Sequence, residues 1–277
     1  MTDRGAGETS LGGAIVVGVA SGFLAGLFGV GGGILIVPGL VFLGMRQRRA
    51  HGTSLAAIIP IAASGIVGFW LEGSVDWPVA AVVTVGAAAG AFLGTTALQR
   101  LEGRALRIGF AALLLATAAR LFLEVSDRTG RADLDVLMIL GLLLLGLFAG
   151  GVAGLFGVGG GVVIVPALVI LFSIPDPVAK GTSLVVILPA ALVGTARNVR
   201  YGNLDLRAAV AVGVSGVVSA FLASKLAIRM DPRLSAVLFA ALLVAVTVRL
   251  LIVERQRTIA KREGRWPPPE EQPEISP

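Results

Sequence analysis

The chain lacks the residues on which most metal and redox chemistry depends. None of its 277 residues is cysteine, so disulfides, thiolate metal sites and cysteine nucleophiles are excluded. Its one histidine, His51, cannot form a multi-histidine metal cluster. We therefore expect no metal centre and no cofactor. An intramembrane serine protease would need a histidine beside a serine inside the helices, and His51 is expected in an arginine-rich loop, so we do not expect an enzyme.

Charge is also scarce. Charged residues make up 14% of the chain, hydrophobic residues 56%, and the mean hydropathy is +0.90. Such a composition predicts a multi-pass integral membrane protein. The first apolar run lacks a basic leader and a cleavage site, so we expect a retained span. Runs near or above the roughly 18 residues that suit a bilayer span are Leu11–Phe28, Gly52–Leu71, Val79–Leu98, Leu106–Leu123, Val136–Phe156, Gly181–Arg197, Ala208–Leu226 and Ser235–Val253.

The acidic and basic residues that are present avoid the interior of these runs. Without buried carboxylates, a cation pump or a carboxylate proton relay has nothing to work with. The glycine runs lack the Gly-Lys-Ser/Thr that binds nucleotide phosphates, so ATP is not expected as the energy source. Arginine and lysine lie in short loops and the tail. We therefore assign the net charge of +6 to membrane topology and not to nucleic-acid binding.

Glycine, in contrast, is abundant and patterned. The nine residues AGLFGVGGG occur at 25–33 and again at 153–161, followed by Pro38 and Pro166. Gly52-Thr53-Ser54-Leu55 likewise matches Gly181-Thr182-Ser183-Leu184. The chain is a tandem duplication. We expect an N-terminal tail at 1–10, a first repeat at 11–124, a linker at 125–135, a second repeat at 136–253 and a disordered cytoplasmic tail at 254–277.

The expected fold is all-α and polytopic, with three to four full spans in each repeat plus one short segment broken by glycine and proline. The short segments Ile34–Gly44 and Val162–Phe172 have about eleven residues, enough for about half of the 30 Å hydrocarbon layer. Each is either a re-entrant half-helix or the continuation of a longer element broken at the glycines.

Charge bias favours an inverted repeat. The loop at 45–51 has three arginines and no acid, whereas its counterpart at 173–180 has one lysine and one aspartate. Two further loop pairs also differ in sign. We expect both termini in the cytoplasm and the protein in the plasma (inner) membrane. The fourth pair of loops is basic in both halves. The loop with Arg100, Arg104 and Arg107 corresponds to the loop with Lys225, Arg229 and Arg233.

The triple glycines are the main candidate site. Non-helical backbone survives inside a bilayer only where it faces protein or a watery cavity. If a new helix begins at each break, its free amides and dipole make an anion site. Close helix packing through small residues is the alternative. The candidate glycines are Gly31, Gly32, Gly33, Gly159, Gly160 and Gly161.

Polar residues and prolines near the breaks complete the candidates. Thr53, Ser54, Thr182 and Ser183 either cap their helices or donate hydrogen bonds to a bound oxyanion. Arg197 beside Asn198 could reach a buried anion, or the arginine could extend to the membrane surface. Pro60 and Pro189 should kink their segments and either act as hinges or shape the bundle.

At these motifs the sequence resembles the TauE/SafE sulfite exporter family. The likeness lies in G-x-x-A-G-L-F-G-V-G-G-G-x-x-x-V-P at Gly22–Pro38 and Gly150–Pro166, with Gly-Thr-Ser-Leu after each. The resemblance implies a plasma-membrane permease for small sulfur-containing or organic anions such as sulfite, sulfonates or sulfoacetate. Family members are commonly described with seven or eight predicted spans, fewer than the ten segments counted here.

We therefore expect a secondary transporter of small anions that works by alternating access. Its coupling partner would be a proton, a sodium ion held by freed carbonyls, or the membrane potential. A passive anion channel is the alternative. The expected partners are a small anionic substrate and the lipid bilayer, with no nucleic acid, and a homo-oligomer is left open.

Overall fold

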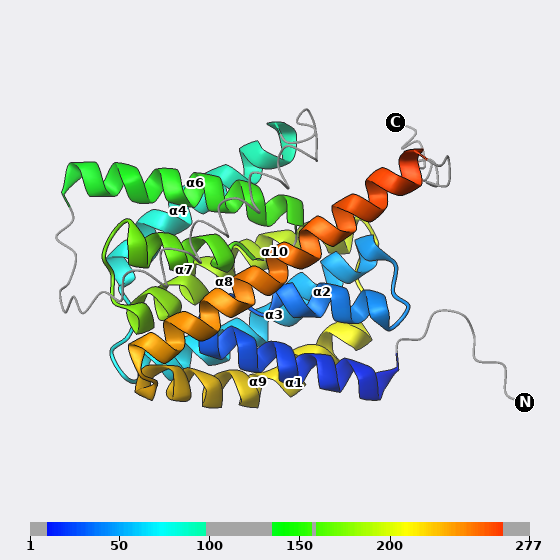
Figure 1. The fold of residues 1–277 in the computed structure, drawn as a ribbon, viewed down its shortest axis with the longest axis horizontal. Coiled ribbons are helices and arrows are strands. Elements are labelled where there is room, and N and C mark those ends of the chain that lie inside the picture. The colour runs from blue at the N-terminus through cyan, green and yellow to red at the C-terminus, as the bar shows by residue number, and fades with distance from the viewer. Residues whose placement is uncertain (1–9, 98–134, 157–158, 263–277) are drawn as a thin grey trace, which may run out of the picture.

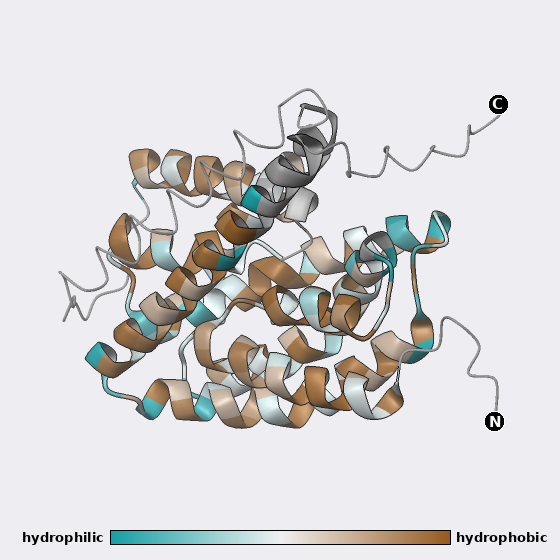
Figure 2. Cartoon of the chain, turned by 45° about the vertical axis from the view of Figure 1, so that its right-hand side comes forward, coloured by the Kyte–Doolittle hydropathy of each residue, from teal (hydrophilic) through white to brown (hydrophobic). Residues whose placement is uncertain are grey.

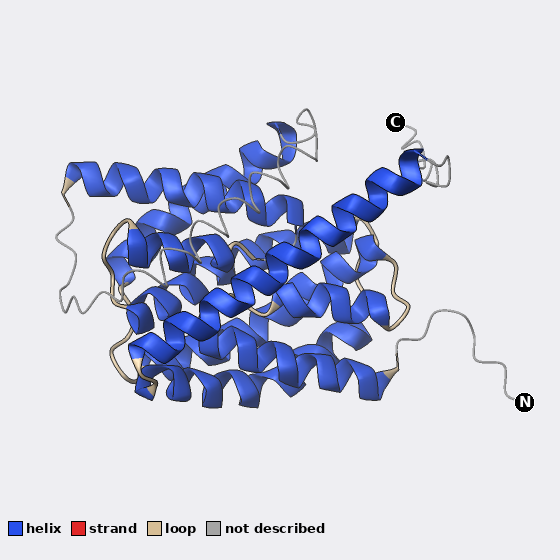
Figure 3. Cartoon of the chain, in the orientation of Figure 1, coloured by secondary structure: helices blue, strands red, loops and turns tan. Residues whose placement is uncertain are grey.

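The computed structural model describes residues 10–97, 135–156 and 159–262, and every regular element in these ranges is an α-helix (Figures 1 and 3). The expected all-α class is confirmed for this part of the chain. The expected span at residues 106–123 and the loop arginines at 100, 104 and 107 lie outside it. The helices are α1 Leu11–Phe28, α2 Gly33–Phe42, α3 Gln47–Trp70, α4 Trp77–Ala97, α6 Val136–Phe156, α7 Gly161–Ile170, α8 Asp176–Arg200, α9 Leu206–Arg229 and α10 Pro232–Arg262.

Apolar side chains cover the outside of the bundle as well as its core. Within the described residues, four helices are long and apolar enough to span a membrane: Leu11–Phe28, Arg49–Trp70, Asp176–Arg200 and Leu206–Arg229. Figure 2 shows apolar residues along the helices and polar residues gathered at their ends. An outward apolar surface of this extent is what a lipid environment requires.

Each short helix turns back along the helix before it. A methyl group placed on Gly39 of α2 would lie 2.7 Å from the Val17 side chain of α1. One helical turn further along, at the C-cap of α2, Leu43 lies 2.5 Å from a methyl placed on Gly13, one turn earlier in α1. The contacts thus run in opposite directions along the two helices. In the second half, Gly141 of α6 approaches Phe172 after α7 in the same way. Each short helix therefore runs antiparallel to the helix before it and does not continue that helix.

Helices α3 and α8 form an antiparallel central pair. Near the end of α3, Gly65 faces Leu184 near the start of α8, and Leu55 faces Gly194 at the other end. The loop after α8 consequently lies beside the start of α3, at the end of the bundle where α1 also begins. We call this end the N-terminal face. The loop after α3 lies beside the start of α8 at the opposite face.

The two halves exchange their outer helices. Helix α1 runs parallel to α9, and α6 runs parallel to α4 (Figure 1). Glycines allow the backbones to touch: a methyl on Gly22 would lie 2.7 Å from the Cα of Gly216, and one on Gly150 would lie 2.7 Å from the Cα of Ala87. Close approach through small residues is a common way for membrane helices to associate.

Two expected boundaries differ from the structure. Helix α10 continues past Glu254 to Arg262, so a tail beginning at residue 254 is wrong. His51 lies in α3 and is half-buried, whereas the sequence analysis put it in a loop. In both places basic residues, which are tolerated in a helix that emerges from the membrane, were taken as the mark of a loop.

Candidate functional site

The two helix breaks consist of backbone that only glycine adopts readily. Gly31 and Gly32 have φ of 72° and 76°, and their counterparts Gly159 and Gly160 have φ of 82° and 74°. These values lie in the left-handed region, where a Cβ atom is costly. The repeated glycines thus let the chain reverse direction between a long helix and a short one.

The breaks meet in the interior of the protein. A methyl group on Gly161 would lie 2.7 Å from the Cα of Val30 and 2.8 Å from the carbonyl oxygen of Gly29. Both loops also face one side chain, since methyls on Gly31 and Gly159 would lie 3.1 and 3.2 Å from Cγ2 of Ile187. All six candidate glycines are buried. The structure therefore brings Gly31–Gly33 and Gly159–Gly161 together at one buried place beside Ile187. We call this place the crossing.

Two helix N-termini point into this crossing. Gly32 is the N-cap of α2 and Gly160 is the N-cap of α7, and no side chain of the described residues caps either helix. The first amides of an α-helix have no partner within the helix. The helix dipole adds roughly half a positive charge at each N-terminus. Two such ends side by side form an environment suited to an anion.

Buried hydroxyl groups add to this environment. Ser21, Ser54 and Ser183 are fully buried, and their oxygens have no hydrogen-bond partner among the described residues. Ser54 and Ser183 precede Ile58 and Ile187 by one helical turn and so share the face that these isoleucines present to the glycine loops. Burying an unpaired hydroxyl costs free energy. These groups are therefore available to a bound ligand.

Ser21 was not a candidate in the sequence. Its carbonyl oxygen lies 2.8 Å from a methyl placed on Gly32, which puts the residue directly against the first break. The corresponding residue of the second half is Ala149. A polar residue in one half opposite alanine in the other was the available signal.

Thr53 and Thr182 have a partner that neither sequence alternative contained. The backbone N–H of Asp205 donates to Oγ1 of Thr53, and the N–H of Asp76 donates to Oγ1 of Thr182, both at 3.0 Å. Each threonine thus holds the loop of the other half. The glycine before it lets that loop approach, since methyls on Gly52 and Gly181 would collide with the carbonyl oxygens of Asn203 and Ser74. We call these two contacts the clasps.

Arg197 and Asn198 are not brought to the crossing. Arg197 is exposed, and it follows Ile187 by ten residues, or about 15 Å of helix. Asn198 donates from Nδ2 to the carbonyl oxygen of Gly194 at 2.8 Å and lies beside the first clasp. Pro60 and Pro189, in contrast, lie within α3 and α8 two residues beyond Ile58 and Ile187, next to the crossing. A hinge role for these prolines stays a prediction.

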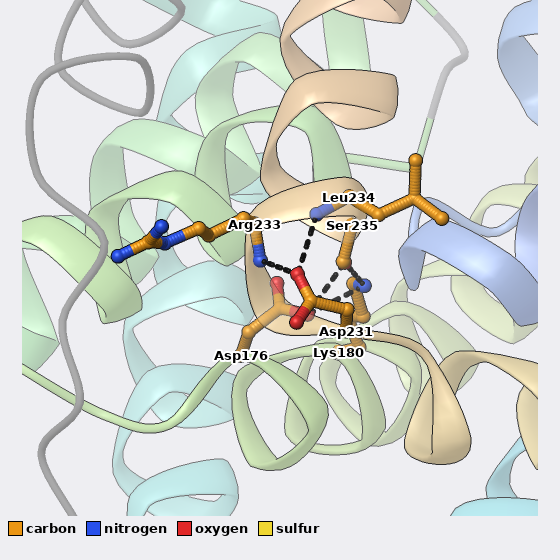
Figure 4. Close-up of polar contacts among 6 residues, drawn as sticks. All are labelled: Asp176, Lys180, Asp231, Arg233, Leu234 and Ser235. Atoms are coloured by element: carbon orange, nitrogen blue, oxygen red, sulfur yellow. Dashed lines mark hydrogen bonds and ion pairs between the residues drawn. The ribbon is translucent and has the colours of Figure 1, made fainter.

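The sequence analysis missed a buried ionic cluster beside the first break (Figure 4). The Lys180 side chain is 0% exposed, and its Nζ lies 2.6 Å from Oδ2 of Asp176. It also donates to Oγ of Ser235 at 2.6 Å, and Ser235 donates to Asp176 at 2.8 Å. Lys180 was counted as a loop charge. It directly precedes Gly-Thr-Ser, as His51 does in the first half, and this correspondence could have identified it.

A polytopic helical membrane protein with two helix breaks meeting in its interior has the architecture of a membrane transporter. Comparison with known proteins identifies the family. The chain belongs to the TauE/SafE family: the family model described as "Sulfite exporter TauE/SafE" matches residues 2–121 and 142–274. This confirms the resemblance seen in the glycine motifs. The family is one of transporters and not of enzymes, as expected.

Individual relatives agree with this membership. A "Probable membrane transporter protein" of Xylella fastidiosa (strain 9a5c) is 30% identical over 213 residues, covering 75% of this chain and 81% of the relative. "Probable membrane transporter protein YunE" of Bacillus subtilis (strain 168) is 26% identical over 216 residues, covering 69% and 79%. The chain is thus a multi-pass membrane protein of a transporter family.

Proposed function

We propose that this protein is a secondary transporter of small anions, sulfur-containing or organic, such as sulfite or sulfonates, and that it works by alternating access. The observation that carries the proposal is the crossing of the two glycine breaks. There two uncapped helix N-termini and the unpaired hydroxyls of Ser54 and Ser183 are buried together. Oxyanions accept hydrogen bonds from such donors.

The proposal includes an inverted repeat. Its support is the antiparallel pairing of α3 with α8 and the exchange of α1 and α6 between the halves. Both described chain ends then belong to the N-terminal face, which carries Arg46 and Arg49 at the start of α3. The opposite face carries Glu72 and Asp76. From the positive-inside bias we assign the N-terminal face to the cytoplasm, and the plasma membrane is the proposed site of action.

The closed crossing supports alternating access. The six glycines are buried, so an anion reaches them only if one side of the bundle opens. The clasps join the halves at opposite ends of the α3 and α8 pair, where such opening would occur. Coupling to a proton or sodium ion, or to the membrane potential alone, belongs to the same proposal.

Flux through proteoliposomes tests the function. Purified protein should carry sulfite, thiosulfate, a sulfonate or acetate with saturable kinetics and counterflow, and an imposed pH or sodium gradient should drive the coupled ion. A flux that neither saturates nor shows counterflow would identify a channel instead. Failure to move any of the four anions under any gradient would refute the proposed function.

Left-handed glycines supply a matched pair of variants for the site. Gly160→Ala, with φ of 74°, places a methyl 3.2 Å from the carbonyl oxygen of Ala149 beside the crossing. Gly202→Ala, with φ of 65°, imposes the same backbone strain at an exposed turn with open space around it. Flux should be lost in the first variant and retained in the second. Equal flux in folded samples of both variants would mean that the glycine breaks are not part of the transport site.

A further inference from the structure

Lys180 has a position and an environment that a structural ion pair does not explain. Its side chain is wholly buried, whereas the side chain of its partner, Asp176, is 19% exposed. The ring of Phe28, the last residue of α1, lies 5.9 Å from Nζ and stacks on Phe239 of α10 at 5.4 Å. The ammonium group therefore lies on the protein side of the pair and the carboxylate on the solvent side.

The backbone of Lys180 adjoins the first glycine break. A methyl group on Gly29 would lie 2.6 Å from the Cα of Lys180 and 2.9 Å from its Cβ. Gly29 begins the loop that leads to the N-terminus of α2. The cluster of Lys180, Asp176 and Ser235 thus stands where this loop leaves the end of α1, at the face opposite the N-terminal face.

We propose that Lys180 is an anion-binding residue of the transport path and that Asp176 is the internal anion that occupies it in the closed state. This inference rests on the proposed function and adds a specific charge to it. A buried ammonium requires a negative partner, because an unpaired one costs several kcal/mol. A sulfite, sulfonate or carboxylate offers the same acceptor oxygens as the Asp176 side chain and can take its place.

Ser235 makes the exchange possible without an unpaired group. Its hydroxyl accepts from Lys180 and donates to Asp176 in the closed state. When the Asp176 side chain turns toward solvent, the hydroxyl can rotate and donate to the incoming anion. No proton transfer is needed, because one anion replaces another.

A second lysine provides an unusually close control. Nζ of Lys225 lies 2.6 Å from Glu72 and 5.7 Å from the ring of Phe221, so its local chemistry repeats that of Lys180. Its side chain is 25% exposed, and it lies near the end of α9 instead of beside a glycine loop. Lys225→Met removes the same charge from the same kind of contact.

The test measures the concentration dependence of sulfite and methanesulfonate flux in proteoliposomes. Lys180→Met should raise KM about tenfold to a hundredfold, the range for losing a hydrogen bond to a charged group. Asp176→Asn should lower KM below the wild-type value, because it removes the competing anion. Lys225→Met should leave KM unchanged. The double variant Asp176→Asn/Lys180→Met avoids leaving the Asp176 carboxylate without its lysine partner and should retain the raised KM.

The opposite signs separate binding from a structural role. If Lys180 and Asp176 only hold the fold together, both single variants should unfold at lower temperature in detergent and neither should lower KM. That result, or a wild-type KM in folded Lys180→Met protein, would overturn the inference while wild-type flux upheld the proposed function. Loss of all flux in the wild type would instead reject the proposed function, and this inference with it.

Discussion

Corresponding positions of the two halves can be compared directly, because an offset of 129 residues aligns Thr53 with Thr182 and Ile58 with Ile187. Both threonines accept an amide of the opposite half at 3.0 Å, and both isoleucines contact the glycine loops. The residue before the Gly-Thr-Ser motif, however, is His51 in one half and Lys180 in the other. The residues that the halves share build the helix packing, the glycine breaks and the clasps, which we call the frame. The residues that differ place a lysine, Lys180, beside the first break only.

The largest effects should come from breaking the frame, and they should be equal in the two halves. Gly22→Leu on α1 and Gly150→Leu on α6 force a side chain into the backbones of Gly216 and Ala87. Overpacking of this kind should cost about 3 kcal/mol or more. Thermal unfolding and size-exclusion profiles in detergent would measure it. Gly12→Leu, on α1 with open space around it, is the control. If only one of the two substitutions were tolerated, the α1–α9 and α6–α4 contacts would not be equivalent.

The clasps come next in size. Thr53→Val and Thr182→Val keep the shape of the side chain but leave a partly buried amide unpaired, which should cost about 1 kcal/mol each. The losses should be similar and additive, because the clasps lie at opposite ends of the bundle. Unfolding temperatures of the two single variants and the double variant test this. If these threonines serve only the ligand, unfolding would not change and only KM would rise.

The buried serines should separate stability from transport. Replacing Ser54 or Ser183 by alanine removes an unpaired hydroxyl, so the unfolding temperature should stay the same or rise. KM for the anion should nevertheless rise about fivefold, as expected for one lost hydrogen bond. Ser21→Ala should behave similarly, although its counterpart Ala149 lacks a hydroxyl. A fall in stability with no change in KM would exclude these hydroxyls from the site.

The smallest effect concerns a pair that exists in one half only. The hydrogen bond and charge of Lys225 lower the pKa of Glu72 below its usual 4.5. A lowered pKa means that the pair stabilises the folded protein above pH 4.5 and that this contribution is lost as the pH falls through the pKa of the folded state. Glu72→Gln should therefore differ slightly from wild type in unfolding temperature at neutral pH, and the two curves should converge in acid. Added salt should also reduce the difference.

The sequence predicted the helix breaks and most helices because the repeated motifs can be recognised directly in the sequence. The paired glycine motifs located both breaks, and most helices begin or end within a few residues of the apolar runs. It failed for single polar residues whose partners lie far away in the sequence. Thr53 and Lys180 look like a cap and a loop charge until folding brings Asp205 and Ser235 to them. Only the packing of the helices against one another determines these contacts.

The charge pattern likewise predicted the general topology but missed a single contact. Three of four loop pairs predicted opposite orientations, and the loop with Lys225 was the exception. In the structure Lys225 lies 2.6 Å from Glu72, so a basic residue that seemed to oppose the topology neutralises an acid on the adjoining turn. Counting charges loop by loop cannot detect such pairing, because Glu72 and Lys225 belong to different halves.

The position of the clasps has a consequence for movement. Each clasp ties one loop at one end of the central helix pair, and the two share no residue. Releasing the Asp205 amide from Thr53 leaves the Asp76 amide bound to Thr182. The protein can thus loosen one end while the other end stays fastened, so that a passage open to both compartments at once would require two separate ruptures.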